Sequence, residues 1–173
     1  MCKNIEGDFT LKTSGGDIYM KDSKGILLAG TSGGDITLQN FSGGSDLSTS
    51  GGDIKADSEK GKIFVSTSGG DIILKASDGE VNAKTSGGDI TLNYNGEHKG
   101  ISLVTSGGDI DVVIPRNLNA DVELKTSGGD LDNNFSNNKM SKISKTKLTG
   151  KYNDGGPKLI CKTSGGDISV REK

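Results

Sequence analysis

The chain has 173 residues, of which 30% are apolar and 4% aromatic, which fits one domain and excludes a core built from large aromatic side chains. Its 21 basic and 23 acidic side chains leave a net charge of −2, which excludes the strongly basic field typical of nucleic-acid-binding proteins. One histidine and two cysteines cannot form a multi-histidine or cysteine-rich zinc site, and we expect Cys2 and Cys161 to be free thiols. No run of 18 apolar residues is present, so we expect no transmembrane segment.

A short glycine-containing motif, Thr-Ser-Gly-Gly-Asp followed by Ile or Leu, recurs along the whole chain. Its copies begin at Thr13, Thr31, Thr49, Thr67, Thr85, Thr105, Thr126 and Thr163. The first five copies start 18 residues apart, and the later intervals are 20, 21 and 37 residues. Faithful repetition at this period is typical of a solenoid, in which like residues stack about 4.8 Å apart.

Each 18-residue period divides into two halves, and each half is a corner followed by a strand with alternating apolar residues. After the Gly-Gly-Asp corners the inward pairs are Ile18 and Met20, Ile36 and Leu38, Ile54 and Ala56, Ile72 and Leu74, Ile90 and Leu92, Ile110 and Val112, and Ile168 and Val170. Before the Thr-Ser corners they are Phe9 and Leu11, Leu27 and Ala29, Ile63 and Val65, Val81 and Ala83, Ile101 and Leu103, Val122 and Leu124, and Leu159 and Cys161. Apolar residues at every second position exclude helices. We predict an all-β fold, a single-domain parallel β-solenoid over residues 1–173 with about 18 residues and two main strands per rung.

Two columns of glycines are expected at the corners. One consists of the Gly-Gly pairs and the other of Gly25, Gly43, Gly61 and Gly79. Because a sharp corner favours positive φ, and glycine adopts it at little cost, we expect this conformation at both columns. Replacement of Gly70 by valine is then expected to strain its rung.

Three segments depart from the repeat. Residues 93–99 and 115–120 carry insertions, which we expect to bulge outward as corner loops that expose Tyr94 and His98. Residues 134–157 are expected to form an irregular excursion or a degenerate rung, extended from Ile143 to Leu148 and followed by a loop from Asn153 to Pro157. The five lysines of this excursion are either a solvated edge or a binding site for a partner. They are Lys139, Lys142, Lys145, Lys147 and Lys151.

The repeated motif also stacks aspartates into a column of mutually repelling charges. The members are Asp17, Asp35, Asp53, Asp71, Asp89, Asp109, Asp130 and Asp167. One interpretation is that each carboxylate accepts hydrogen bonds from corner N–H groups. The other is a row of weak calcium sites, for which Asp17, Asp35, Asp53, Asp71, Asp89 and Asp109 are the candidate ligands. One carboxylate per rung is sparse for an ion that takes six to eight ligands, and calcium is the only cofactor considered.

The Thr-Ser-Gly-Gly-Asp-Ile units, the stretch from Ile114 to Val122 and the closing segment from Asn153 to Ile168 resemble a bacterial adhesin-like family of unassigned function. The resemblance covers nearly the whole chain. It implies a parallel β-solenoid and a location outside the cytoplasm, at the cell surface or in the periplasm. The first ten residues lack a charged segment followed by an apolar run, so we expect this chain, if exported, to be the mature part.

Three functional hypotheses follow. The favoured one is a non-enzymatic structural or interaction module, adhesin-like, that binds a protein or glycan at the cell surface. The second is a solenoid stabilised by calcium. The third is a polysaccharide-cleaving enzyme that uses Asp109, Asp111 and Arg116, whereas a Ser-His-Asp arrangement would depend on His98, which we interpret as a surface residue. Unpaired strand edges at the ends of the solenoid would also allow end-to-end self-association.

Overall fold

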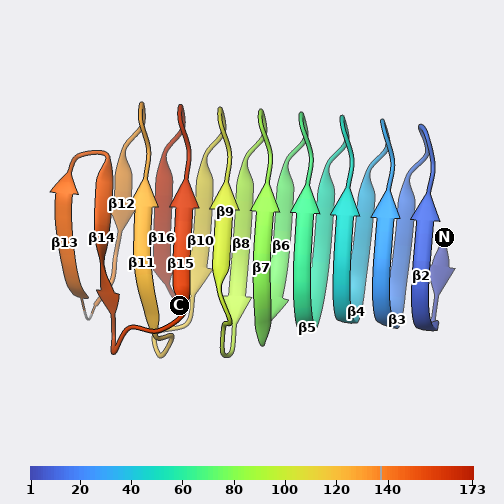
Figure 1. Ribbon diagram of the computed structural model, residues 1–173, viewed down its shortest axis with the longest axis horizontal. Helices are drawn as coiled ribbons and strands as arrows, with labels where there is room; N and C mark the ends of the chain where they lie inside the picture. The colour runs from blue at the N-terminus through green and yellow to red at the C-terminus, as the bar shows by residue number, and fades with distance from the viewer. Residues whose placement is uncertain (137) are drawn as a thin grey trace.

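The computed structural model is a rod of stacked rungs with the two halves of each rung in two layers (Figure 1). It describes residues 1–136 and 138–173, with the backbone alone at 59 and 138–143. The described residues contain sixteen strands and no helix. In chain order they are β1 (Cys2–Lys3), β2 (Glu6–Lys12), β3 (Ile18–Gly30), β4 (Ile36–Ser48), β5 (Ile54–Ser66), β6 (Ile72–Ser77), β7 (Gly79–Lys84), β8 (Ile90–Asn95), β9 (Ile101–Val104), β10 (Ile110–Ile114), β11 (Ala120–Lys125), β12 (Leu131–Asn133), β13 (Asn138–Ser144), β14 (Lys147–Tyr152), β15 (Lys158–Lys162) and β16 (Ile168–Glu172). The predicted all-β parallel solenoid is confirmed.

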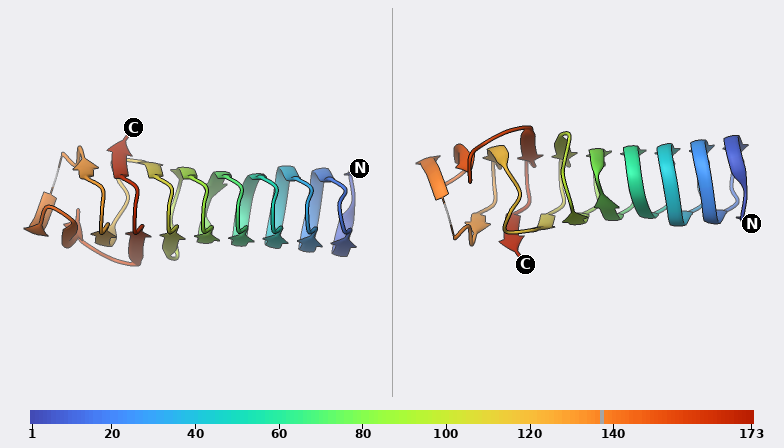
Figure 2. Two further views of the ribbon diagram at one scale, coloured as in Figure 1. Left: turned by 90° about the horizontal axis from the view of Figure 1, so that it is seen from above. Right: turned by 90° about the horizontal axis from the view of Figure 1, so that it is seen from below.

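The two layers face each other across a narrow core (Figure 2). The front layer of Figure 1 contains β2, the second halves of β3 to β5, and then β7, β9, β15, β11, β14 and β13. The back layer contains β1, the first halves of β3 to β5, and then β6, β8, β10, β16 and β12. Because β3, β4 and β5 continue through the lower corner, the two layers belong to one continuous sheet. No helix in the described part of the chain could cross a bilayer.

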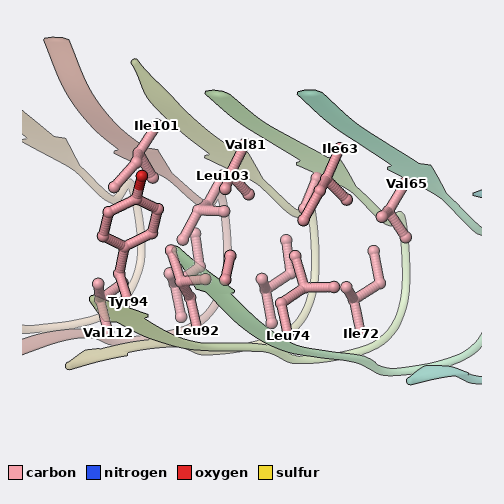
Figure 3. Close-up of a cluster of buried hydrophobic side chains, with 14 of the residues drawn as sticks. Ile63, Val65, Ile72, Leu74, Val81, Leu92, Tyr94, Ile101, Leu103 and Val112 are labelled. Atoms are coloured by element: carbon pink, nitrogen blue, oxygen red, sulfur yellow. The ribbon is translucent and has the colours of Figure 1, made fainter. Parts of the chain in front are cut away.

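Like residues stack on like residues, as the 18-residue period predicts. Ile36 lies beside Ile54, and Ile72 lies beside both Ile54 and Ile90, all in parallel register. Figure 3 shows side chains of the two layers, such as Ile63 and Leu74, pointing toward one another in the core. Each fully buried aliphatic side chain stabilises the fold by about 1.5–3 kcal/mol. The predicted inward pairs are confirmed: all are buried except Phe9 and Leu11 of the first rung, which are partly buried.

The Gly-Gly corners require glycine for lack of space between rungs, and not for positive φ as predicted. Positive φ occurs at Gly25, Gly43 and Gly61, with values of 138°, 136° and 119°. It does not occur at Gly79 or at the glycines of the Thr-Ser-Gly-Gly corners, so the conformational prediction is wrong there. The cause is a close approach between rungs, since a Cβ atom on Gly70 would overlap the carbonyl oxygen of Gly52.

The threonine of each corner joins two rungs. The Thr67 hydroxyl is buried, donates a hydrogen bond to the Gly52 carbonyl of the preceding rung at 3.0 Å, and accepts one from Gly70 N–H at 3.3 Å. The same pair of bonds recurs at the corners that begin with Thr31, Thr49, Thr85, Thr105, Thr126 and Thr163. Each corner therefore satisfies polar groups that would otherwise be buried without partners.

At the C-terminal end the order of rungs in space differs from their order in the chain. Strand β15 lies between β9 and β11, and β16 lies between β10 and β12. Register is kept, because Ile168 pairs with Ile110 on one side and with Leu131 on the other. The last strand pair of the chain is thus inserted one rung before the end of the rod.

Of the two alternatives for residues 134–157, the described part of this segment is an irregular excursion and not a degenerate rung. Strands β13 and β14 form an antiparallel hairpin, and β14 pairs antiparallel with β11. The segment from Ile143 to Leu148 is not one extended strand, because it contains the hairpin turn at Lys145 and Thr146. The loop from Asn153 to Pro157 is confirmed, and it returns the chain to the inserted strand β15.

In the inserted segment 93–99, Tyr94 and His98 turn inward, whereas residues 95–97 are exposed. Tyr94 continues the inward parity of Ile90 and Leu92 and is fully buried. Its hydroxyl accepts a hydrogen bond from Gly79 N–H at 2.8 Å and donates one to the Gly79 carbonyl at 2.9 Å. His98 is 6% exposed, lies edge-on to the Tyr94 ring and has Nε2 2.9 Å from the Asn119 carbonyl oxygen. The predicted exposure of Tyr94 and His98 is therefore wrong.

The two cysteines are free thiols, as predicted. Cys2 is partly exposed in the first rung, and Cys161 is buried in β15. Burial raises the pKa of the Cys161 thiol to about 12. This thiol is therefore neutral and unreactive at physiological pH.

The glycine corner gives a direct prediction. Substitution Gly70→Ala should lower the free energy of unfolding by about 3 kcal/mol or more, because its Cβ atom meets a backbone carbonyl that cannot move without shifting a rung. Gly69→Ala is the matched control, since the nearest atom to its Cβ would be the Gly51 carbonyl oxygen at 3.7 Å. Denaturant unfolding measures both, and equal losses in the two variants would contradict this explanation.

His98 gives a prediction about pH. Burial lowers the pKa of His98 in the folded protein, and the hydrogen bond to Asn119 only partly opposes this effect. The unfolded chain then binds the proton more tightly, so stability should fall as pH drops below about 6.5 toward the lower folded pKa. The loss is about 1.4 kcal/mol for every tenfold difference in proton affinity between the two states. Denaturant unfolding at pH 7.5 and 5.0 should show that His98→Gln loses less of its free energy of unfolding between these pH values than the wild type does. The same loss in both proteins would refute the prediction.

Candidate functional site

The aspartate column forms a ladder of hydrogen bonds along one edge of the rod. In each rung Oδ1 of the aspartate accepts the backbone N–H of the aspartate in the next rung, at 2.7–2.9 Å. The spatial order of the column is Asp17, Asp35, Asp53, Asp71, Asp89, Asp109, Asp167 and Asp130. Hydrogen bonds to ionised acceptors are strong and offset the repulsion between neighbours. The predicted role as acceptor of corner N–H groups is confirmed.

The hydrogen bonds of the ladder reduce the number of carboxylate oxygens that are open to a calcium ion. Except at Asp130, one oxygen of each carboxylate already accepts an N–H group, which leaves the other oxygen of that aspartate for an ion. The described residues contain no group of three or more histidine, cysteine, aspartate or glutamate side chains that could hold a metal. Calcium binding by this column stays a prediction.

The residues considered for polysaccharide cleavage each have a different partner. Asp109 belongs to the ladder and accepts the N–H of Asp167. Asp111 Oδ1 lies 3.3 Å from Arg171 Nη2. Arg116 Nε lies 3.8 Å from Glu172 Oε2. These contacts give each residue a local structural role at the C-terminal end of the back layer.

A hollow of about 610 Å³ lies beside the His98 loop. Among its lining residues are Asp78, Glu97, His98 and Asn119. Their polar groups serve the loop itself, since Asp78 Oδ1 accepts the Glu97 N–H at 3.1 Å and His98 contacts the Asn119 carbonyl. The atom Nδ1 of His98 is buried without a hydrogen-bond partner among the described residues, so it does not face an open binding surface.

Of the five predicted lysines, two lie on the outer face of the front layer. Lys147 and Lys151 alternate with the buried residues Leu148 and Tyr152 on β14 and therefore point outward. Lys145 is exposed in the hairpin turn. The side chains of Lys139 and Lys142 lie outside the described residues.

Three further lysines, Lys125, Lys158 and Lys162, lie on the same face and were not predicted from the sequence. Strand pairing places Lys162, Lys125 and Lys147 side by side on β15, β11 and β14, which makes a row of three across adjacent strands. Lys158 and Lys151 likewise flank Asp121. We call the outward side chains of Lys125, Lys147, Lys151, Lys158 and Lys162 the lysine surface. The alternation indicates that these residues point outward, but the inserted strand β15 hides their proximity in the sequence.

Two carboxylates lie within the lysine surface. Glu123 Oε1 is 2.9 Å from Lys162 Nζ. This hydrogen bond, with the charges of Lys162, Lys147 and Lys158, lowers the pKa of Glu123 against the opposing effect of burial. Asp121 Oδ1 accepts the Gly156 N–H at 3.4 Å, which fixes the returning loop. Five lysines against two carboxylates leave this surface with a net charge of +3 on a protein whose total is −2.

A shallow hollow of about 340 Å³ lies beside Lys151 and Lys158 of the lysine surface. Its walls combine charged side chains with apolar and small residues. The residues around it are Asp121, Val122, Glu123, Thr149, Gly150, Lys151, Lys158 and Ile160. Two lysines and two carboxylates line this hollow, so its charges balance. An extended anionic chain would instead be held by charge along the row of Lys162, Lys125 and Lys147 beside it.

The comparisons with known proteins identify a family. The model of the Toastrack DUF4097 family, a domain of unknown function, matches residues 3–171. No curated protein and no solved structure gives a significant match. Because the family match covers nearly the whole solenoid, this chain belongs to the Toastrack DUF4097 family.

Proposed function

We propose that this protein is a non-enzymatic interaction module that binds an anionic polysaccharide through the lysine surface, at the bacterial surface or in the periplasm. The observation that carries the proposal is the row of Lys162, Lys125 and Lys147 on three adjacent strands. The resemblance of the repeats to an adhesin-like family supports the location, and the buried, neutral Cys161 thiol is compatible with an oxidising compartment.

The lysine row costs stability in the absence of a partner. Like charges directly opposite each other on neighbouring strands are destabilising. Glu123 forms an ion pair with Lys162 and is also attracted to the more distant charge of Lys147. Among the described residues, Lys125 and Lys147 have no carboxylate within ion-pair distance. An anionic ligand would relieve this repulsion, and the strands hold the lysine backbones in place before binding.

The surface chemistry favours a charged glycan over a neutral one. Neutral sugars are held largely by stacking on aromatic side chains, and this chain has no tryptophan and only 4% aromatic residues. Phe64, the large exposed aromatic residue of the front layer, lies on β5 and away from the lysine surface. A polyuronate chain instead offers regularly spaced carboxylates to the regularly spaced lysines.

We propose a binding role without catalysis because the candidate catalytic side chains already contact other groups of the fold. Asp109 accepts a backbone N–H, and Asp111 is ion-paired with Arg171. His98 is buried against Tyr94 and Asn119. Asp109 and Asp111 line one hollow of about 300 Å³, but their contacts with Asp167 and Arg171 use them within the fold, which supports a binding role over acid–base catalysis.

Binding of polygalacturonate tests the proposal. The wild-type protein should bind it with an affinity that falls as salt is raised, and Lys125→Gln/Lys147→Gln should weaken binding at least about tenfold. Lys55→Gln/Lys75→Gln is the matched control, because it removes the same charge from the back layer. Titration calorimetry measures the affinities, and neutral dextran should not bind.

Three outcomes would contradict the proposal. Equal weakening by the control pair would show that net charge, not the lysine surface, governs binding. Binding of poly-glutamate without binding of polygalacturonate would assign the surface to an acidic protein. Appearance of new reducing ends or unsaturated products from polygalacturonate would show that the protein is an enzyme.

A further inference from the structure

The two ends of the rod differ in how their core is covered. Among the described side chains, four hydrophobic residues pack against the core while only partly buried. Cys2, Phe9 and Leu11 belong to the N-terminal rung, and Leu131 belongs to the other end. At the C-terminal end the β13–β14 hairpin extends the front layer, and the Phe135 and Tyr152 rings pack 4.7 Å apart. The N-terminal end is therefore the less covered one.

The edge of β2 also has unpaired backbone groups. In this solenoid the N–H groups of inward residues donate toward the next rung, as Thr13 does to the Gly30 carbonyl at 3.0 Å. Outward residues bond toward the preceding rung, as Lys24 N–H does to the Ile5 carbonyl at 2.9 Å. By this alternation the outward residues of β2, which are Glu6, Asp8, Thr10 and Lys12, direct their N–H and C=O groups to its outer edge. Within the described residues that edge pairs with no strand.

We propose that a second copy of this chain covers this edge, with β2 pairing antiparallel to β2 of the second copy about a two-fold axis through Phe9. In this register Glu6 lies opposite Lys12 of the second copy, and the same ion pair forms twice. Asp8 lies opposite Thr10 of the second copy, and both residues direct their backbone groups to the shared edge. The two Phe9 side chains meet on the core side, where antiparallel strands approach most closely.

Other registers are less favourable. A shift of two residues in one direction places Asp8 opposite Asp8 of the second copy, which puts like charges together. A shift of two residues in the other direction shortens the paired segment from the seven residues of β2 to five, Asp8 to Lys12. A shift of one residue aligns outward groups with inward ones and loses the hydrogen bonds. The register centred on Phe9 alone uses the whole strand.

The shape of the two ends favours a closed dimer over a filament. Beyond β11 the front layer continues for two more strands, β14 and β13, whereas the back layer ends at β12 (Figure 1). A second rod stacked head to tail on this stepped end could not pair with both layers. Pairing of like ends instead gives an isologous contact that closes after two copies. If the proposed function also holds, the dimer carries its two lysine surfaces on one side, at opposite ends of a doubled rod.

Charge exchange tests the dimer with the full chain. Sedimentation equilibrium should show a reversible dimer, and Glu6→Lys or Lys12→Glu should each weaken it about tenfold or more, because two attractive pairs become repulsive. The double variant Glu6→Lys/Lys12→Glu should restore dimerisation. Lys62→Glu/Glu80→Lys is the matched control, since it exchanges a front-layer ion pair of 2.9 Å away from the edge and should leave dimerisation unchanged. Glu6 also lies 3.4 Å from Lys24, so thermal melting is recorded to confirm that each variant folds.

Thiol cross-linking tests the register independently. In a Cys2→Ser background, Phe9→Cys should form a disulfide-linked dimer on mild oxidation, because the two-fold axis brings the substituted side chains together. Thr10→Cys should not, because its counterpart across the axis is Asp8. A monomer at all concentrations, assemblies larger than a dimer, or equal cross-linking of both variants would overturn the proposal.

Discussion

The close approach of successive rungs at the Gly-Gly corner is the constraint on which the structure depends. The second glycine of each corner leaves no room for a Cβ atom above the carbonyl oxygen of the corner before it. The buried threonine hydroxyl and the aspartate carboxylate then bond across the same step, so each corner fixes the spacing and the register together. Everything else in the rod, from the stacked isoleucines to the rows of outward side chains, follows from that register.

Because every corner makes the same contacts, the rungs are interchangeable in space. Asp109 bonds to Asp167, and Asp167 to Asp130, with the same geometry that joins consecutive rungs elsewhere. The chain can therefore place its last strand pair one rung before the end without any change in local structure. This insertion brings Lys162 beside Lys125 and so creates the lysine surface from segments that are far apart in the sequence.

Much of the fold could be predicted from the sequence, because its physical signals are local. Alternation identified the buried pairs, and the repeated aspartate next to a corner indicated its role as an acceptor. Tyr94 was misjudged although the signal was present, since it continues the parity of Ile90 and Leu92. The order of the rungs could not be predicted, because Ile110, Leu131 and Ile168 follow the same local motif and any two of them can pair. For the same reason only Lys147 and Lys151 of the lysine surface were predicted, because the position of β15 beside β11 could not be deduced from the sequence.

Disulfide trapping between rungs is the most direct test of this account. Register places Ser169 beside both Asp111 and Asp132, whereas those two aspartates are separated by two strand spacings, about 9.6 Å. In a Cys2→Ser background, Asp111→Cys/Ser169→Cys and Asp132→Cys/Ser169→Cys should both form disulfides, and Asp111→Cys/Asp132→Cys should not. Asp132→Cys/Ser169→Cys should form a disulfide in either order and is the positive control. A disulfide in Asp111→Cys/Asp132→Cys, with none in Asp111→Cys/Ser169→Cys, would show that the rungs stack in chain order and would contradict the central claim.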